Sequence, residues 1–384
     1  MQGSASGEAM GQEAPRGEAA RGGRHKIAPL TGVRAVAATW VVLFHLHYFV
    51  SSAFPTFPEV VERFAAAGYL GVDLFFLLSG FVLSYQYLDA FRALSLRPYA
   101  RFLALRLARI YPVHLFTLML ALGILVVGRA RGLAPADPAT HSAGAFVANV
   151  LLVHAWGVVD QLTWNVPSWS ISCEWLAYLA FPILALRLRR IRSRLAAAAL
   201  VIFGLGFAVV GLRLYGVPSL DANVHGGPVR IAGEFVAGCA LFLFHREVQG
   251  SAAGARTAAF ATAFAVLGIV ALIMVRRADP FALIFFAVLI VALALSPHGL
   301  AKPLSAPLVI FFGEASYSLY MTHVIVLRVL KVVFPMSRFA ERSLAVRAGV
   351  LGGYLALIFA AAALTYVAVE RPAREWLRRR IDGR

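Results

Sequence analysis

Long apolar segments recur from one end of the chain to the other, and each has about the length of a membrane-spanning helix. Such a helix needs about twenty mostly apolar residues. Ten runs fit this requirement, at residues 30–50, 68–88, 106–127, 168–187, 195–214, 229–245, 257–275, 280–296, 307–333 and 346–369. Because a backbone inside lipid must satisfy its own hydrogen bonds, the pattern predicts an all-α, polytopic bundle of about ten spanning helices.

The composition is that of an integral membrane protein. Hydrophobic residues make up 60% of the chain and charged residues 14%, and the mean hydropathy is +0.76. These values exclude a soluble domain of this length. A shorter apolar run, residues 145–156, lies among polar and Pro-rich loops. It is below spanning length, so we expect it to be re-entrant or interfacial.

The net charge of +17 does not point to a nucleic-acid partner, because the arginines gather in alternate loops rather than on one soluble face. This distribution is typical of positive-inside topology and predicts a multi-pass cell-membrane protein with both termini cytoplasmic. A minority of arginines fall on the other side: Arg129, Arg131, Arg276, Arg277, Arg338 and Arg342. We expect a disordered cytoplasmic tail (1–26), a transmembrane domain (27–370) and a basic cytoplasmic tail (371–384).

Arg34 and His45 lie in the first apolar segment, eleven residues apart. Eleven steps of about 100° come to roughly three turns, so both residues share one helix face. At about 1.5 Å per residue the histidine lies about 16 Å deeper than the arginine. A cation at the membrane edge and a titratable base deep on the same face indicate an anionic ligand whose reactive end reaches the histidine.

Counting along the predicted helices places the other ionisable groups at two depths. His45, Asp73, Glu174, Glu234 and His323 converge on the outer half of the bilayer. The second depth, near the inner surface, holds Arg34, Arg106 and Arg109. The last two are i, i+3 neighbours on one helix face, a spacing that suits a bidentate clamp on phosphate oxygens.

Each of these residues also has a structural interpretation. The three arginines can extend to the inner headgroups, and the carboxylates Asp73 and Glu174 can be ion-pair partners between helices. Glu234 has Arg230 one turn away, so the structural pair is the favoured interpretation there. A histidine inside the membrane can also be a packing residue without any catalytic role. Cys173 and Cys239 both lie in predicted helices and form neither a disulfide framework nor a CxxC metal motif, so no metal site is expected.

Seven short motifs occur along the chain in a fixed order. They are LTGVRAVAATWVVLFH (30–45), GVDLFFLLSGF (71–81), RLARIYP (106–112), PSWSISCEW (167–175), RIAGEF (230–235), SYSLYMTH (316–323) and ERP (370–372). Together they resemble membrane acyltransferase family 3. The resemblance implies transfer of an acyl group, acetyl or another short chain, from a coenzyme A thioester to a hydroxyl group, with acyl-CoA as co-substrate and no permanently bound cofactor.

The resemblance also implies roles for individual residues. His45 would be the catalytic base or a transient acyl carrier with Arg34 as its partner, and Arg106 and Arg109 the donor-side motif. Glu174 and His323 would be further site residues. The predicted depths add that Asp73 or Glu174 can orient the imidazole of His45 or stabilise its cationic form. Ser79, Tyr317 and backbone N–H groups are candidate oxyanion donors.

The acceptor and one rival function stay open at the level of sequence. Members of this family without an extra domain acylate envelope carbohydrates or antibiotics such as macrolides, so both acceptor classes are expected for this chain. The alternative is a multi-pass transporter of a polar or anionic small molecule. Such a transporter is expected to show Gly- or Pro-broken helix pairs in corresponding halves, and the sequence has none that we identify.

Overall fold

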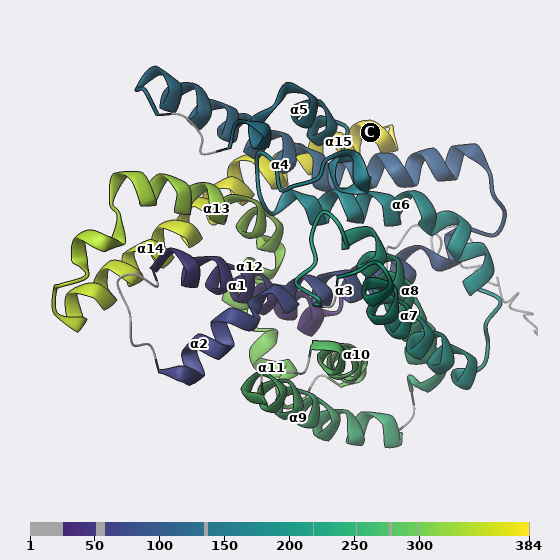
Figure 1. The fold of residues 1–384 in the computed structure, drawn as a ribbon. Coiled ribbons are helices and arrows are strands. Elements are labelled where there is room, and N and C mark those ends of the chain that lie inside the picture. The colour runs from purple at the N-terminus through teal and green to yellow at the C-terminus, as the bar shows by residue number, and fades with distance from the viewer. Residues whose placement is uncertain are drawn as a thin grey trace, which may run out of the picture.

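A computed structural model describes residues 26–50, 58–133, 137–217, 219–250, 252–275, 279–296 and 298–383 (Figure 1). Within these ranges all regular structure is helical, which confirms the predicted all-α class. Nine helical segments of the described part are long and apolar enough to cross a membrane, and a tenth, Pro280–Leu295, is shorter. The predicted tail 1–26 lies outside the described residues except for Lys26.

The helix bounds follow the predicted apolar runs closely. The helices are α1 (Ala28–Val50), α2 (Glu59–Ala66), α3 (Leu70–Tyr87), α4 (Leu96–Ala130), α5 (Ala143–Val150), α6 (Ser168–Leu188), α7 (Arg194–Leu214), α8 (Gly227–Val248), α9 (Ala252–Val275), α10 (Asp279–Leu295), α11 (Ala301–Leu304), α12 (Pro307–Glu314), α13 (Ser316–Val333), α14 (Leu344–Thr365) and α15 (Arg371–Asp382). Residues 145–156 form most of α5 and an irregular turn, so they do not span, as predicted.

The run 307–333 differs from the prediction of one continuous helix. It is divided into α12 and α13 at Ala315, whose ψ of 0° departs from helical geometry. The division leaves the first N–H groups of α13 without acceptors inside their own helix. The side chain of Glu370 accepts from one of these N–H groups, that of Ser318.

Most of the predicted basic C-terminal tail is helical, as α15. This helix packs beside α4 at one edge of the bundle (Figure 1). Arg101 of α4 donates to Asp382 at 2.6 Å, and Arg371 pairs with Glu375 along α15 itself. The segment is rich in arginine, which is why it was predicted to be a basic tail, and several of its charges have partners on α4 and within the helix.

Close helix packing in the centre of the bundle depends on glycine. Gly80 of α3 and Gly238 of α8 face each other so closely that a Cβ atom on either would overlap backbone of the opposite helix. Helices α7 and α8 lie side by side next to this contact (Figure 1). The short α3–α8 distance brings Asp73 of α3 against Arg230 of α8, which matters for the assignment of Asp73 below.

Candidate functional site

His45 and His323 form a hydrogen-bonded pair between α1 and α13, hereafter the histidine pair. His323 Nε2 lies 3.1 Å from His45 Nδ1, and the ring centroids are 4.8 Å apart. His323 is fully buried, whereas His45 is half-buried. The structure therefore brings together two histidines separated by 278 positions, as their similar predicted depth implied.

Backbone carbonyls assign the protons of the histidine pair. His323 Nδ1 lies 3.2 Å from the carbonyl oxygen of Leu319, so Nδ1 donates there and Nε2 is left as an acceptor. His45 Nδ1 supplies the proton to that acceptor and also lies 3.0 Å from the carbonyl oxygen of Val41. This arrangement leaves the lone pair of His45 on Nε2. Nε2 is thus the nitrogen of His45 that can accept a proton, and the contact with His323 favours one ring orientation and tautomer of its partner.

An internal cavity of about 120 Å³ lies among α1, α3, α4, α6 and α13, and we call it the arginine cavity. A single water molecule needs roughly 10–15 Å³ by this measure, so several waters or one short polar group would fit. Apolar side chains form much of its wall. Its polar lining includes three arginines, a glutamate and several hydroxyl groups, among them Arg34, Arg106, Arg109, Glu174, Ser79 and Tyr317.

Glu174 belongs to the arginine cavity, which differs from its predicted place at the depth of His45. Ser79 Oγ donates to Glu174 Oε1 at 2.8 Å, and Tyr178 OH donates to the same oxygen at 2.5 Å. Counting along single helices does not include how neighbouring helices are placed, and that placement brings Glu174 to the arginines. Two hydroxyl donors hold this carboxylate in place beside the three arginines.

The three arginines differ in how far their charge is compensated. Arg109 Nη1 donates to Glu370 at 2.7 Å. Arg106 donates to the hydroxyl of Tyr87 at 3.0 Å, and its guanidinium lies 5.0 Å from the centre of that ring. No hydrogen bond or ion pair from the described residues reaches the guanidinium of Arg34. Arg34 is thus the cation most available to a ligand.

Tyr320 connects the arginine cavity with the histidine pair, and Phe75 packs against it. Both line the cavity, and their ring centroids are 6.1 Å apart. The Tyr320 ring is 6.0 Å from that of His323, and its hydroxyl lies 2.7 Å from Ser170 Oγ. Neither residue was predicted to belong to the site. Tyr320 thus contacts both polar centres.

Asp73 lies apart from both centres in a buried group that we call the sealed cluster: Asp73, Arg230 and Glu234. Arg230 Nη2 lies 2.8 Å from Asp73 Oδ1, and all three side chains are almost completely buried. The Arg230 guanidinium also lies 5.4 Å from the ring centre of Trp169. The predicted Arg230–Glu234 pair is replaced by Arg230–Asp73, and neither oxygen of Glu234 has a hydrogen-bond donor in the described part of the chain.

The sequence-predicted residues thus divide into three places. The histidine pair holds His45 and His323, the arginine cavity holds four more of them, and Asp73 lies in the sealed cluster. Glu370 received no role from the sequence, although its motif ERP was recognised. Among the described residues no group of three or more His, Cys, Asp and Glu side chains could hold a metal ion.

Comparison with known proteins adds an independent line of information. A family model of the acyltransferase domain matches residues 27–370. The chain is 28% identical over 374 residues to "Acyltransferase MdmB" of Streptomyces mycarofaciens, covering 92% of this chain and 93% of that protein. It is 23% identical over 373 residues to "O-acetyltransferase OatA" of Staphylococcus aureus, covering 90% of this chain but only 57% of OatA. No solved structure matches.

Proposed function

We propose, from the premise that this chain belongs to the acyltransferase domain family and is a membrane O-acyltransferase, that it moves an acyl group from acyl-CoA to a hydroxyl group. The proposed acceptor is a carbohydrate or an antibiotic such as a macrolide, and the acyl group is acetyl or another short chain. The observation that carries the proposal is the 3.1 Å contact between His45 and His323, which leaves His45 Nε2 as a base.

The reaction assigned to this base is acyl transfer with balanced proton movement. His45 Nε2 removes the proton of the acceptor hydroxyl, and the oxygen attacks the thioester carbonyl carbon. The carbon–sulfur bond breaks, and the imidazolium returns its proton to the leaving thiolate. In transfer through an acyl-histidine, Nε2 itself first bonds the carbonyl carbon and the thiolate leaves. The acceptor hydroxyl then attacks the acyl carbon, its proton passes to the thiolate, and the bond between carbon and Nε2 breaks. His323 acts as the positioning partner in both versions.

The arginine cavity is the proposed binding site for part of the donor. Pockets that enclose a drug-sized ligand measure roughly 300–1,000 Å³, so a cavity of about 120 Å³ holds a section of acyl-CoA and not the whole molecule. The guanidinium of Arg34 has no ion-pair partner among the described residues. This supports contact between Arg34 and an anionic or strongly polar section of the donor. For the acyl end to reach His45, it must pass Tyr320, which lines the cavity and lies 6.0 Å from the ring of His323.

The proposed orientation places both termini in the cytoplasm, where acyl-CoA is made, and the arginine bias of the loops supports it. Cysteines introduced at Ser193 and Ser219 test it, because native Cys173 and Cys239 are buried and give little background. An impermeant thiol reagent added to intact cells is expected to label Ser219→Cys alone. Labelling of Ser193→Cys alone would reverse the orientation and the proposed donor side.

Purified protein in lipid nanodiscs, incubated with acetyl-CoA labelled in the acetyl group, tests the donor and the reaction. Label is expected to appear on an added carbohydrate or macrolide hydroxyl, and slow loss to water is expected without acceptor. Absence of both transfer and hydrolysis across short acyl-CoAs would reject acyl-CoA as donor. The same protein in sealed vesicles addresses the transporter alternative, which requires unmodified solute to cross the bilayer.

A further inference from the structure

Glu370 is a buried carboxylate that contacts both a cavity arginine and the helix of the histidine pair. It closes the π-helical turn Tyr366–Glu370, directly before α15, and only 1% of its surface is exposed. Burying a carboxylate destabilises a fold unless charges and hydrogen-bond donors surround it. The partners of Glu370 therefore indicate what it does.

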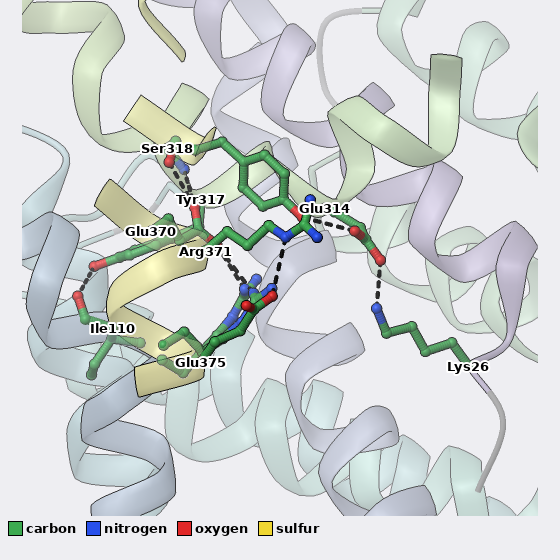
Figure 2. A network of polar contacts seen from close by, with 11 residues as sticks. Lys26, Ile110, Glu314, Tyr317, Ser318, Glu370, Arg371 and Glu375 are labelled. Carbon is green, nitrogen blue, oxygen red and sulfur yellow. Dashed lines mark hydrogen bonds and ion pairs between the residues drawn. The ribbon is translucent and has the colours of Figure 1, made fainter. Parts of the chain in front are cut away.

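The two oxygens of Glu370 have different partners. Oε1 accepts from Arg109 at 2.7 Å and, at 3.5 Å, from Arg374 one turn along α15. Oε2 accepts from the backbone N–H of Ser318 at 3.2 Å and from its hydroxyl at 2.7 Å. Figure 2 shows Glu370 between Ser318 and the start of α15. One carboxylate thus joins α4, α13 and α15.

The Ser318 contact explains how α13 begins. Ser318 is the third residue of α13, so its N–H is one of the first-turn groups that lack an acceptor inside their helix. No side chain of the preceding turn supplies one. Glu370 accepts from this N–H, and a negative charge at a helix N-terminus is also favoured by the helix dipole. Because α13 carries Tyr320 and His323, Glu370 helps to fix the helix of the histidine pair.

The Arg109 contact sets the charge of the arginine cavity. Three guanidinium groups, of Arg34, Arg106 and Arg109, stand against two carboxylates, Glu174 in the wall and Glu370 behind Arg109. The balance is one net positive charge. Without Glu370 it would be two, and Arg109 would present an uncompensated guanidinium to anything in the cavity.

We infer that Glu370 is a positioning residue that holds Arg109 as a compensated cation and leaves Arg34 as the main cation for the donor. The inference rests on the proposed function, in which acyl-CoA enters this cavity. If this holds, Glu370 lowers the affinity of the arginine cavity for anions. Free coenzyme A can then leave after transfer.

Glu370→Gln tests this, because glutamine keeps the shape and an acceptor oxygen for Arg109 while removing the charge. The probe is free coenzyme A, titrated by calorimetry into full-length protein in nanodiscs. Affinity is expected to rise about tenfold, the order of effect of one unit charge uncovered about 10 Å away at an effective dielectric constant of about 20. Turnover is expected to fall through slower product release.

Glu375→Gln is the matched control. Glu375 lies five residues further along the same segment, is 47% exposed and pairs with Arg371 at 3.1 Å (Figure 2). The substitution changes the net charge of the protein equally, and coenzyme A affinity is expected to stay at the wild-type value. If Glu370 only joined α4, α13 and α15, Glu370→Gln would weaken coenzyme A binding or leave it unchanged. Either result overturns the inference.

Two further variants keep the test decisive. Glu370→Asp retains the charge, so coenzyme A affinity should remain close to wild type; a rise equal to that of Glu370→Gln would contradict the charge argument. If Glu370→Gln does not fold, Arg109→Gln lowers the cavity charge instead and should weaken coenzyme A binding about tenfold. Unchanged affinity there overturns the inference. Failure of wild-type protein to bind coenzyme A would reject the proposed donor instead, a separate result.

Discussion

The arginine cavity and the sealed cluster are both groups of arginine and carboxylate inside the same bundle, yet they differ in whether a ligand can reach them. In the sealed cluster Arg230 is 1% exposed and pairs with Asp73 at 2.8 Å, without lining the cavity. In the arginine cavity Arg34 and Glu174 face open space, and Arg34 has no ion-pair partner among the described residues.

The difference teaches that an ionisable residue in a membrane helix is not by itself a functional residue. Charges are costly there in either case. A pair that compensates itself and fills its space can hold helices together, as Arg230 and Asp73 hold α8 against α3. A charge that borders a cavity without full compensation is available to a ligand. The predictions below set the two groups against each other.

The largest effect is expected at the histidine pair. His45→Ala should lower acyl transfer by about 10²–10⁴-fold, the usual loss for a general base, with little change in Tm in detergent. His47→Ala is the control, because His47 lies on another face of α1 two residues away. Transfer by His45→Ala above roughly 10% of wild type, measured with labelled acetyl-CoA, would remove His45 from the mechanism.

The sealed cluster should respond through stability instead. Asp73→Ala removes the carboxylate that pairs with Arg230 at 2.8 Å, and breaking a buried pair in this way costs about 3–5 kcal/mol. A clear fall in Tm is expected, with the transfer rate per folded molecule near wild type. A catalytic role for Asp73, which its predicted depth beside His45 suggested, requires the opposite: a large loss of rate per folded molecule at an unchanged Tm.

A smaller effect is expected in donor affinity. Lysine keeps the charge of Arg106 or Arg109 but lacks the planar fork that binds phosphate through two hydrogen bonds. Arg106→Lys and Arg109→Lys should each raise KM for acyl-CoA about tenfold, or ~1.4 kcal/mol, while KM for the acceptor hardly changes. Arg101→Lys, on an exposed part of α4, is the control. Selective loss of acceptor affinity would instead place the acceptor in the arginine cavity.

Much of the fold could be predicted from the sequence, because apolar length alone determines which segments span. The division at Ala315 could not, since it depends on acceptance of the Ser318 N–H by Glu370, 52 positions further on. The helical part of the C-terminal segment was also missed, because the partners of its charges lie on α4 and within α15. Local sequence patterns do not indicate hydrogen bonds and ion pairs between residues that are far apart in the chain.

The site was predictable where one helix supplies the geometry. Arg106 and Arg109 share a face of α4 and both line the cavity, as their spacing implied. Contacts between helices were harder to predict. Asp73 pairs with Arg230, 157 positions away, and Arg109 with Glu370, 261 positions away. Such pairs depend on the rotation and tilt of each helix, which hydropathy does not specify.

The most direct test of the central claim compares Glu174→Gln with Glu234→Gln. Both substitutions replace one carboxyl group inside the bundle by an amide, one at the arginine cavity and one in the sealed cluster. The measurement is the initial rate of acetyl transfer from acetyl-CoA per folded molecule. The account predicts a large loss for Glu174→Gln and a rate close to wild type for Glu234→Gln. Equal losses, or a loss only in Glu234→Gln, would contradict the assignment of function to the cavity.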